Sequence, residues 1–255
     1  MKTNKNRITF RIGENIVVLR HGKTSNKKIA QANENIVQTY TFSQAQYEYI
    51  YQCEKDSVKP IFSTFFSLDT ANCGDCPFAA NKAFNVTKIG KCYTHKVMQY
   101  SGFISMLKSI NKQFDTFADI PTYEQAKSDI AMYAVTKCMD KYVRFGTYGE
   151  PTVIPIDVIA VMADCAKSYT GYTHQWIKNK DYSQFFMASV HNESGATMAL
   201  KFGYRSFIAS KEDKVPAAVI CPASKEAGFK STCALCGLCS GTAGKGKKDV
   251  VIIEH

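Results

Sequence analysis

The chain has 255 residues, of which 45% are hydrophobic and 12% aromatic, so it can bury a full core without disulfides. No stretch approaches the roughly 18 consecutive apolar residues of a membrane span, and the opening sequence MKTNKNRITF lacks the apolar run of a secretion signal. These features exclude a protein built on transmembrane helices and predict a cytoplasmic location. In a reducing compartment, ten cysteines are more typical of metal binding or catalysis than of disulfides.

The N-terminal 60 residues predict a β-hairpin followed by a helical extension. Residues 8–21 contain two short β-rich runs on either side of the turn sequence at 13–15, which is a hairpin signal. Residues 22–36 are polar and predict a loop. The segment 61–70, IFSTFFSLDT, predicts a strand that ends just before the first group of cysteines.

Beyond residue 60, helix and strand signals alternate along the chain. Helical patterns cover residues 97–114, 122–139, 155–167 and 194–203. Strand patterns cover residues 141–145, 169–173, 185–190, 205–209, 217–220 and 250–253. Such alternation is typical of a parallel sheet with crossover helices. The predicted fold class is therefore α/β, a partial (β/α) barrel or an open parallel sheet with an N-terminal β-hairpin. We expect an extension at 1–60 and a metal-cluster α/β domain at 61–255.

The strongest chemical signal is a group of cysteines near the C-terminus. Its members are Cys221, Cys233, Cys236 and Cys239. Gaps of two residues allow neighbouring thiolates to converge on one centre, and Gly237 and Gly241 relieve crowding where the backbone wraps around it. A CxxCxxC triplet with a remote Cys-Pro favours a [4Fe–4S] cluster, with tetrahedral zinc as the alternative.

A second group of cysteines, Cys73, Cys76 and Cys92, is less decisive about its metal. Three cysteines alone would leave one iron of a cluster open to water or substrate. His95 follows Cys92 closely and is a candidate fourth ligand, which would make the group an acceptable structural zinc site. Both alternatives remain open from the sequence.

The other cysteines with a clear pattern are Cys53, Cys138 and Cys165. Each lies in a helical pattern beside apolar neighbours. Because a free cysteine packs as a small hydrophobe, we expect these three to belong to the core.

Polar residues follow the ends of several predicted strands. They are Cys73, Glu150, His174, His191, Cys221 and His255. The carboxyl ends of parallel strands share one edge of a sheet, where active sites of α/β proteins lie. We therefore expect Glu150, His174 and His191 to line a cavity as candidate catalytic residues.

The formal net charge of +10, with a pI near 9.0, favours a polyanionic partner such as nucleic acid. Basic residues gather near both ends of the chain, and Lys245, Lys247 and Lys248 form one such run. No pattern in the sequence indicates an oligomeric state.

Several motifs give the chain a family resemblance over about residues 61–255. They are GTYGEP (146–151), TGYTHQW (170–176), MASV (187–190), GYRSF (203–207) and CPASKEAG…TCALCGLCSG (221–241). Together they resemble an uncharacterised cysteine-rich family encoded largely by phages and mobile elements. That resemblance implies a location in the host cytoplasm and brings no established activity with it.

A weaker, architectural similarity is to radical S-adenosylmethionine enzymes, which have a partial barrel, three cluster cysteines after the first strand and a GGEP-like turn after the second. This similarity implies that Gly149 and Glu150 contact S-adenosylmethionine and that Cys73, Cys76 and Cys92 hold a cluster with an open iron. The spacing differs from the compact CxxxCxxC of that superfamily.

The leading hypothesis from the sequence is thus an iron–sulfur protein, and an enzyme, with one open cluster and one fully ligated auxiliary cluster. The competing hypothesis is a zinc-stabilised nucleic-acid-binding module without catalysis.

Overall fold

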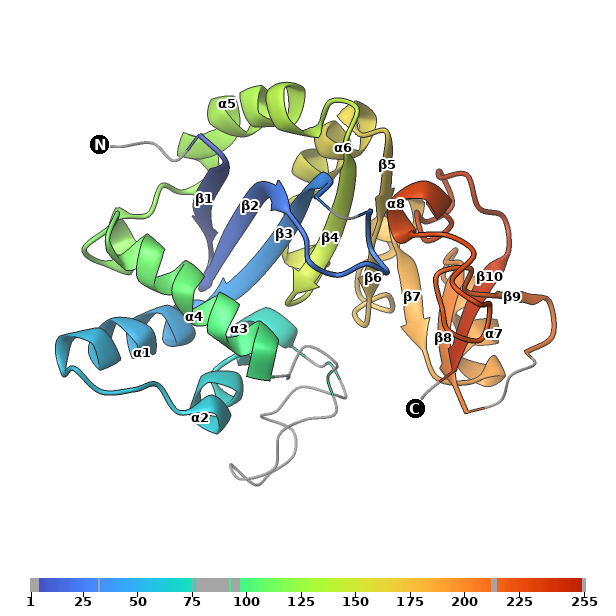
Figure 1. The fold of residues 1–255 in the computed structure, drawn as a ribbon, viewed down its shortest axis with the longest axis horizontal. Helices are drawn as coiled ribbons and strands as arrows, with labels where there is room; N and C mark the ends of the chain where they lie inside the picture. Colours follow the sequence, from blue (N-terminus) through green and yellow to red (C-terminus); the bar gives the residue numbers. More distant parts are fainter. Residues whose placement is uncertain are drawn as a thin grey trace.

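The computed structural model describes residues 5–31, 33–74, 76, 92, 97–211 and 215–253. In this part of the chain the strands form two five-stranded sheets (Figure 1). The first sheet has the order β1 (Arg7–Ile12), β2 (Asn15–Lys23), β3 (Asn35–Ser43), β4 (Tyr142–Tyr148) and β5 (Ser168–Thr170). The second has the order β6 (Tyr172–Thr173), β7 (Met187–Val190), β8 (Ser206–Ser210), β10 (Asp249–Ile253) and β9 (Ala218–Ile220).

The N-terminal strands β1 and β2 form the predicted hairpin. Ile12 pairs with Asn15 across a two-residue turn, and Gly13 in that turn has φ +53°. A glycine with positive φ at the first central position is typical of the hairpin turns that match strand twist. The β2 strand then pairs antiparallel with β3.

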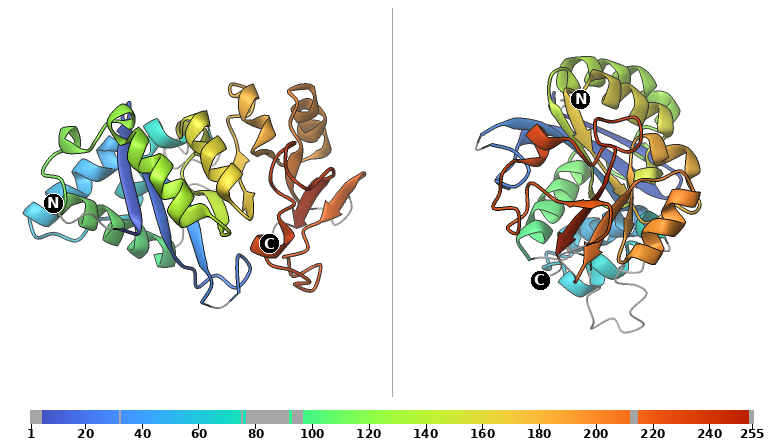
Figure 2. Two further views of the ribbon diagram at one scale, coloured as in Figure 1. Left: turned by 90° about the horizontal axis from the view of Figure 1, so that it is seen from above. Right: turned by 90° about the vertical axis from the view of Figure 1, so that its right-hand side faces the viewer.

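From β3 onward every strand pairing is parallel, so the predicted α/β fold class with an N-terminal hairpin is confirmed. The two sheets follow one another along the long axis of the molecule (Figure 2). Gly171 alone separates β5 from β6. A Cβ at Gly171 would lie 2.5 Å from the Phe186 ring, so the close approach at this junction requires glycine.

Helices cover both faces of the first sheet, and α7 packs on the second. The α-helices of the described residues are α1 (Gln44–Lys55), α2 (Phe62–Ser67), α3 (Thr70–Cys73), α4 (Val97–Asn111), α5 (Tyr123–Tyr133), α6 (Ile156–Cys165), α7 (Glu193–Lys201) and α8 (Cys233–Cys236). The described residues also contain four shorter helical segments: the 3₁₀ turns η2 (Phe117–Asp119), η4 (Pro151–Val153) and η5 (Lys180–Gln184), and the π-helix η3 (Ala134–Cys138). The predicted capping box at the start of α5 is present, because Thr122 Oγ1 accepts from Gln125 N and Gln125 Oε1 accepts from Thr122 N.

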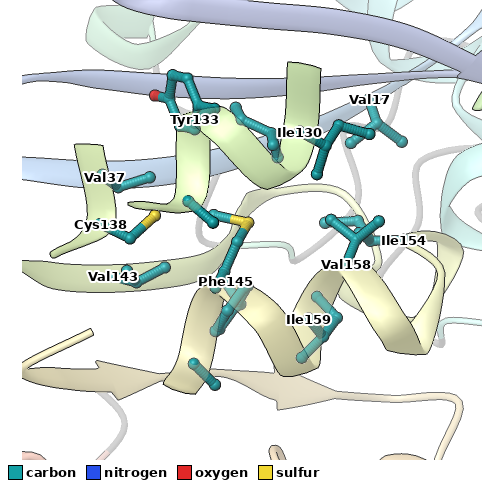
Figure 3. Packing of buried hydrophobic residues seen from close by; sticks show 14 of the residues in the cluster. Val17, Val37, Ile130, Tyr133, Cys138, Val143, Phe145, Ile154, Val158 and Ile159 are labelled. Atoms are coloured by element: carbon teal, nitrogen blue, oxygen red, sulfur yellow. The ribbon is translucent and has the colours of Figure 1, made fainter. Parts of the chain in front are cut away.

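Side chains alternate between the two faces of the first sheet and build two cores. Val17 and Leu19 of β2 lie in the outer core, with α5 and α6. Ile16 and Val18 lie in the inner core, with α1, α2 and α4. Figure 3 shows the outer core, where Val17 and the helical side chains of Ile130 and Val158 lie close together. Burial of each such side chain stabilises the fold by about 1.5–3 kcal/mol.

Two predicted segments differ from the structure. Residues 61–70 were expected to form a strand but lie in α2 and at the start of α3. Phe65 and Phe66 are fully buried against α4 and Tyr148, so tertiary packing overrides their preference for a strand. The first parallel strand is instead β3, which begins at the end of the loop expected at 22–36 and for which no strand was expected.

Candidate metal centres and the carboxyl edge of the sheet

The four C-terminal cysteines lie together. One small cavity of about 10 Å³ is lined by Cys221, Cys233, Cys236 and Cys239, together with side chains of β5, β6 and β10. These cysteines pack on the face of the second sheet opposite α7, because Phe207 and Val250 face them while Ile208 and Val251 face α7. We call Cys221, Cys233, Cys236 and Cys239 the cysteine quartet.

Local backbone features hold the CxxCxxC segment in a tight path. Thr232 caps the short helix α8 by accepting from Leu235 N, and Gly237 ends it with φ +62°. Gly241 has φ +64°, and a Cβ there would lie 2.6 Å from the backbone of Gln184. The two glycines therefore do what the sequence predicted, because they let the backbone wrap closely around the quartet.

Arg205 is the main anchor of the loop that follows. Arg205 is 8% exposed, and its guanidinium donates to the carbonyl oxygens of Leu238 (3.0 Å), Gly241 (2.8 Å) and Lys248. The donors come from two nitrogens held apart in a rigid plane, whereas the three donors of a lysine all lie on one nitrogen. Arg205 thereby ties both sides of the segment 238–248 to β8.

The loop between β2 and β3 also binds the segment that carries the quartet. Cys233 N donates to Lys28 O (3.0 Å) and Ala234 N to Ile29 O (2.9 Å). Ser168 Oγ, on β5, donates to Ala234 O. The quartet is thus positioned by segments that are distant in sequence.

Burial raises the pKa of three thiols, those of Cys221, Cys233 and Cys239. The pKa of Cys233 is raised to about 11 and that of Cys239 to about 12, in both cases chiefly through desolvation. The positive charges of Arg144 and Lys28 act in the opposite direction on the pKa of Cys233. Ionising several of these thiols together therefore requires a cation at the site, which a metal would supply.

The donor set fits a four-thiolate metal centre, but the side chains as they stand do not form one. Within the described residues, no group of three or more His, Cys, Asp or Glu side chains is arranged to hold a metal ion. The cavity is about the size of one water molecule. Binding a metal centre would therefore require the thiols to reorient around it.

The second group of cysteines lies beyond the carboxyl end of β3. Cys73 ends α3, its Sγ donates to Asp69 Oδ2 (3.4 Å), and Cys76 N donates to Cys73 O (3.1 Å). Burial raises the pKa of Cys73 well above its usual value, and Asp69, Cys76 and Cys92 add to this in turn. Cys76 and Cys92 are thus close enough to influence Cys73. His95 lies outside the described residues.

Asn72 joins this group to the turn after β4. Its side chain is 1% exposed, its Nδ2 donates to Thr41 O (2.8 Å), and its Oδ1 accepts from Glu150 N (3.3 Å) and Thr41 Oγ1. Gly149 has φ +78°, and a Cβ there would lie 2.2 Å from Asn72 Oδ1. The backbone conformation of Gly149 and the packing of Asn72 against it are therefore enough to require a glycine here, without any cofactor.

Glu150 and the two histidines meet at the same edge. Glu150 is 6% exposed and accepts from Thr152 N (3.2 Å), Thr152 Oγ1 (3.1 Å) and His174 N (3.2 Å). Burial raises the pKa of Glu150 despite these hydrogen bonds. The rings of His174 and His191 stack with centroids 6.3 Å apart. Burial, and then the proximity of His191, lowers the pKa of His174 to about 4.

The structure therefore brings Cys73, Glu150, His174 and His191 into one connected group. Gln175 completes it, since its Nε2 donates to Cys73 O (3.3 Å) from the residue next to His174. The structure differs from the expectation at one point, because Cys73 is the last residue of the helix α3 and does not follow a strand. His255 lies outside the described residues.

Sequence reasoning did not find Asn72, Gln175 or Arg205. Asn72 directly precedes Cys73, and Gln175 directly follows His174 in the TGYTHQW motif. Their position beside candidate site residues was therefore the feature of the sequence that could have identified them. Nothing in the sequence distinguishes Arg205 from an exposed arginine. Of the expected core cysteines, Cys53 and Cys138 are buried and Cys165 is partly exposed.

No protein-family model, curated protein or solved structure matches this chain. In the described part of the chain, no helix combines the length and the apolar character needed to cross a membrane.

Proposed function

We propose that this chain is a cytoplasmic iron–sulfur protein in which the cysteine quartet binds one fully ligated cluster. A single observation carries the proposal: cysteines separated by eleven residues and by two gaps of two residues line one cavity. Four thiols at one place, two of them buried and two partly exposed, bring no packing advantage over ordinary apolar side chains, whereas they match the ligand set of a [4Fe–4S] centre.

The proposal extends to an enzyme whose reactive centre lies at the carboxyl edge of the first sheet. There Cys73, Cys76 and Cys92 would hold a second cluster, and a cluster with an open iron supplies a coordination position for a cofactor such as S-adenosylmethionine. The order of elements supports this, since the cysteines follow the first parallel strand, β3, and the GTYGEP turn follows the second, β4.

The chain's own residues would carry out proton handling at that edge. Glu150 has a raised pKa and is fixed by hydrogen bonds from Thr152 and His174 N. His174 stays neutral over most of the pH range in which histidines titrate, so its imidazole can accept a proton from a bound substrate. His191, stacked on His174, would orient that ring.

A zinc-bound, non-catalytic module is the second candidate. It is favoured by the cavity of about 10 Å³, which is closer to the size of one ion than of a cluster. In that case both cysteine groups are structural, and the exposed Lys245, Lys247 and Lys248 contact nucleic acid.

Elemental analysis distinguishes these candidates. The protein is purified anaerobically, and iron, zinc and acid-labile sulfide are measured per chain for the wild type, for Cys236→Ser and for the matched control Cys165→Ser. We expect iron and sulfide in the wild type, a loss of metal together with a lower melting temperature in Cys236→Ser, and neither change in Cys165→Ser. Zinc without sulfide selects the second candidate. Equal metal content in the two variants contradicts the quartet as a ligand set.

The enzymatic part has its own test. Reduced protein is incubated with S-adenosylmethionine, and both its binding and its cleavage products are measured, with Cys76→Ser as the control. Binding and cleavage that depend on Cys76 support the proposal. Absence of both in protein that contains its full iron leaves an electron-transfer or structural role.

A further inference from the structure

The helix α5 and the π-helix η3 that continues it have an apolar outer surface. They lie on the outside of the first sheet (Figure 1), and their buried side chains, such as Ile130 and Cys138, belong to the outer core (Figure 3). The side of a surface helix that faces solvent normally carries polar and charged residues. Here that side carries three large apolar side chains. They are Met132 (65% exposed), Val135 (52% exposed) and Met139 (48% exposed).

These side chains form one continuous stripe. Residues three or four positions apart lie on the same side of a helix, and Val135 follows Met132 by three positions and precedes Met139 by four. Ala131 is also exposed and lies four positions before Val135, so it extends the stripe. Contiguous exposed apolar surface marks sites where proteins associate. We call Ala131, Met132, Val135 and Met139 the apolar stripe.

The helical segment that carries the stripe has no net charge. In the range 123–141, three acidic residues balance three basic ones. The whole chain, in contrast, has a formal net charge of +10, so two copies repel each other over most of their surfaces. An uncharged apolar face is where this repulsion is weakest, and it offers nothing to a polyanion. The six charged residues are Glu124, Asp129 and Asp140, and Lys127, Lys137 and Lys141.

The start of this segment is negative. Lys127 pairs with Glu124 (2.8 Å), so these two charges cancel. Asp129 is exposed and forms no ion pair within the described residues. Asp157 of α6 lies beside this end, since it accepts a hydrogen bond from Tyr123 Oη. The charges of Asp129 and Asp157 are therefore left over.

The end of the segment is positive. Lys137 and Lys141 lie close enough to His21 of β2 to lower its pKa, although burial of that ring contributes more. Asp140 offsets one of these two positive charges. Neither lysine forms an ion pair in the part of the chain that the structure describes. The segment thus carries opposite charges at its two ends, with the apolar stripe between them.

We propose that the apolar stripe is the contact surface of a homodimer, in which a second copy of this chain packs its own stripe antiparallel to the first. A two-fold axis through such a contact places the same surface on both copies. It also brings the negative start of one segment beside the positive end of the other, so that the two copies attract each other. A parallel arrangement would instead bring like charges together. Methionine side chains adapt their shape to an apolar partner, which suits a surface that packs against itself.

The dimer should be a weak one. Interfaces that bury less than about 1,200 Å² are typically transient, and a contact through one helical segment from each copy falls in this class, so we expect a dissociation constant of about 10–100 µM. No member of either cysteine group lies on α5 or η3. Dimer formation and metal binding are therefore separate measurements, and failure of either leaves the other intact.

Sedimentation velocity over a protein concentration of about 1–300 µM measures the dimer. The test variant is Val135→Asp, which places a charge in the middle of the stripe. The matched control is Leu200→Asp, which places the same charge at an exposed apolar position of α7. Both positions are exposed, so both variants should fold, and the melting temperature checks this. We expect Val135→Asp to raise the dissociation constant about ten-fold or more and Leu200→Asp to leave it unchanged.

A charge exchange tests the antiparallel arrangement without changing the stripe. Asp129→Lys removes the excess negative charge at the start, and Lys141→Glu makes the end negative. Each variant alone should dimerise about three- to ten-fold more weakly than the wild type. An equimolar mixture, with one variant labelled with fluorescein, should form a mixed dimer that is tighter than the dimer of either variant alone, because opposite charges meet again.

Three results would overturn the proposal. The first is a wild type that remains monomeric over the whole concentration range. The second is a dimer that Val135→Asp and Leu200→Asp affect equally, because the contact would then lie elsewhere on the chain. The third is a mixture of Asp129→Lys and Lys141→Glu that associates no more tightly than the separate variants.

Discussion

Replacing Gly149 with alanine tests the link between the GTYGEP turn and the first cysteine group. At φ +78° the new Cβ would lie 2.0 Å from Thr41 Oγ1 and within 2.2–2.5 Å of the side-chain O and N atoms of Asn72. Neither group can move away freely, because Asn72 and Thr41 are both buried and bonded to each other.

The expected cost follows from two separate effects. A residue with a Cβ in the left-handed region loses about 1–2 kcal/mol relative to glycine. Displacing Asn72 leaves buried partners such as Thr41 O and Glu150 N without hydrogen bonds, at about 1–3 kcal/mol. The free energy of unfolding should therefore fall by about 2–5 kcal/mol.

The matched control is Gly13→Ala. Gly13 also has a positive φ, +53°, but a Cβ there would have no atom within 4 Å. This variant should lose only the backbone part, about 1–2 kcal/mol. Urea denaturation of both variants measures the difference. If the two variants lose the same free energy of unfolding, the packing of Asn72 against Gly149 is not what requires the glycine.

Two further predictions concern His174 and Arg205. The pKa of His174 is about 4 in the folded chain, against 6.5 for a histidine in the unfolded chain. Between these two values the unfolded chain binds more protons than the folded chain. The free energy of unfolding therefore falls as the pH falls. Between pH about 7 and about 5, the loss of free energy of unfolding that His174 causes is about 2 kcal/mol. Urea denaturation of metal-free protein over that range should therefore show a smaller loss for His174→Asn than for the wild type. Equal losses in the two proteins would contradict a neutral imidazole at His174. Arg205→Lys should lower the free energy of unfolding by about 2–4 kcal/mol, because the single nitrogen of a lysine cannot reach all the carbonyls that Arg205 bonds from two separate nitrogens. Arg11→Lys, which removes one bond to Ile120 O, should cost about half as much or less. Similar costs would contradict the anchoring role of Arg205.

Local signals in the sequence accounted for much of the fold. The hairpin around Gly13, the capping box at Thr122 and the strand ends before His174 and His191 all depend on neighbours within a few residues. Such features can be predicted because the chain determines them locally. The grouping of the cysteine quartet also followed from short gaps that bring thiols together.

The segment 61–70 could not be predicted in this way. Its aromatic residues favour a strand when considered alone, but Phe65 and Phe66 become helical because the inner core offers them Tyr148 and Phe103 as partners. Those partners come from β4 and α4, far along the chain. The strand β3 was missed for the related reason that Gln38, Thr39 and Thr41 read as polar while all are buried.

The roles of Asn72 and Arg205 were equally out of reach of the sequence. Asn72 can bond to the turn after β4 because Gly149 has no Cβ that would collide with it. Arg205 can anchor the segment 238–248 because three carbonyls converge on its guanidinium. Each depends on contacts between segments that only the folded chain brings together. The candidate edge of Glu150, His174 and His191 could be predicted because parallel strands end at a common edge.

The most direct test of the central claim is anomalous scattering at the iron and zinc edges from crystals of anaerobically purified protein. The account predicts an iron peak bounded by the sulfur atoms of Cys221, Cys233, Cys236 and Cys239. Well-ordered cysteine side chains with no metal peak between them would contradict it.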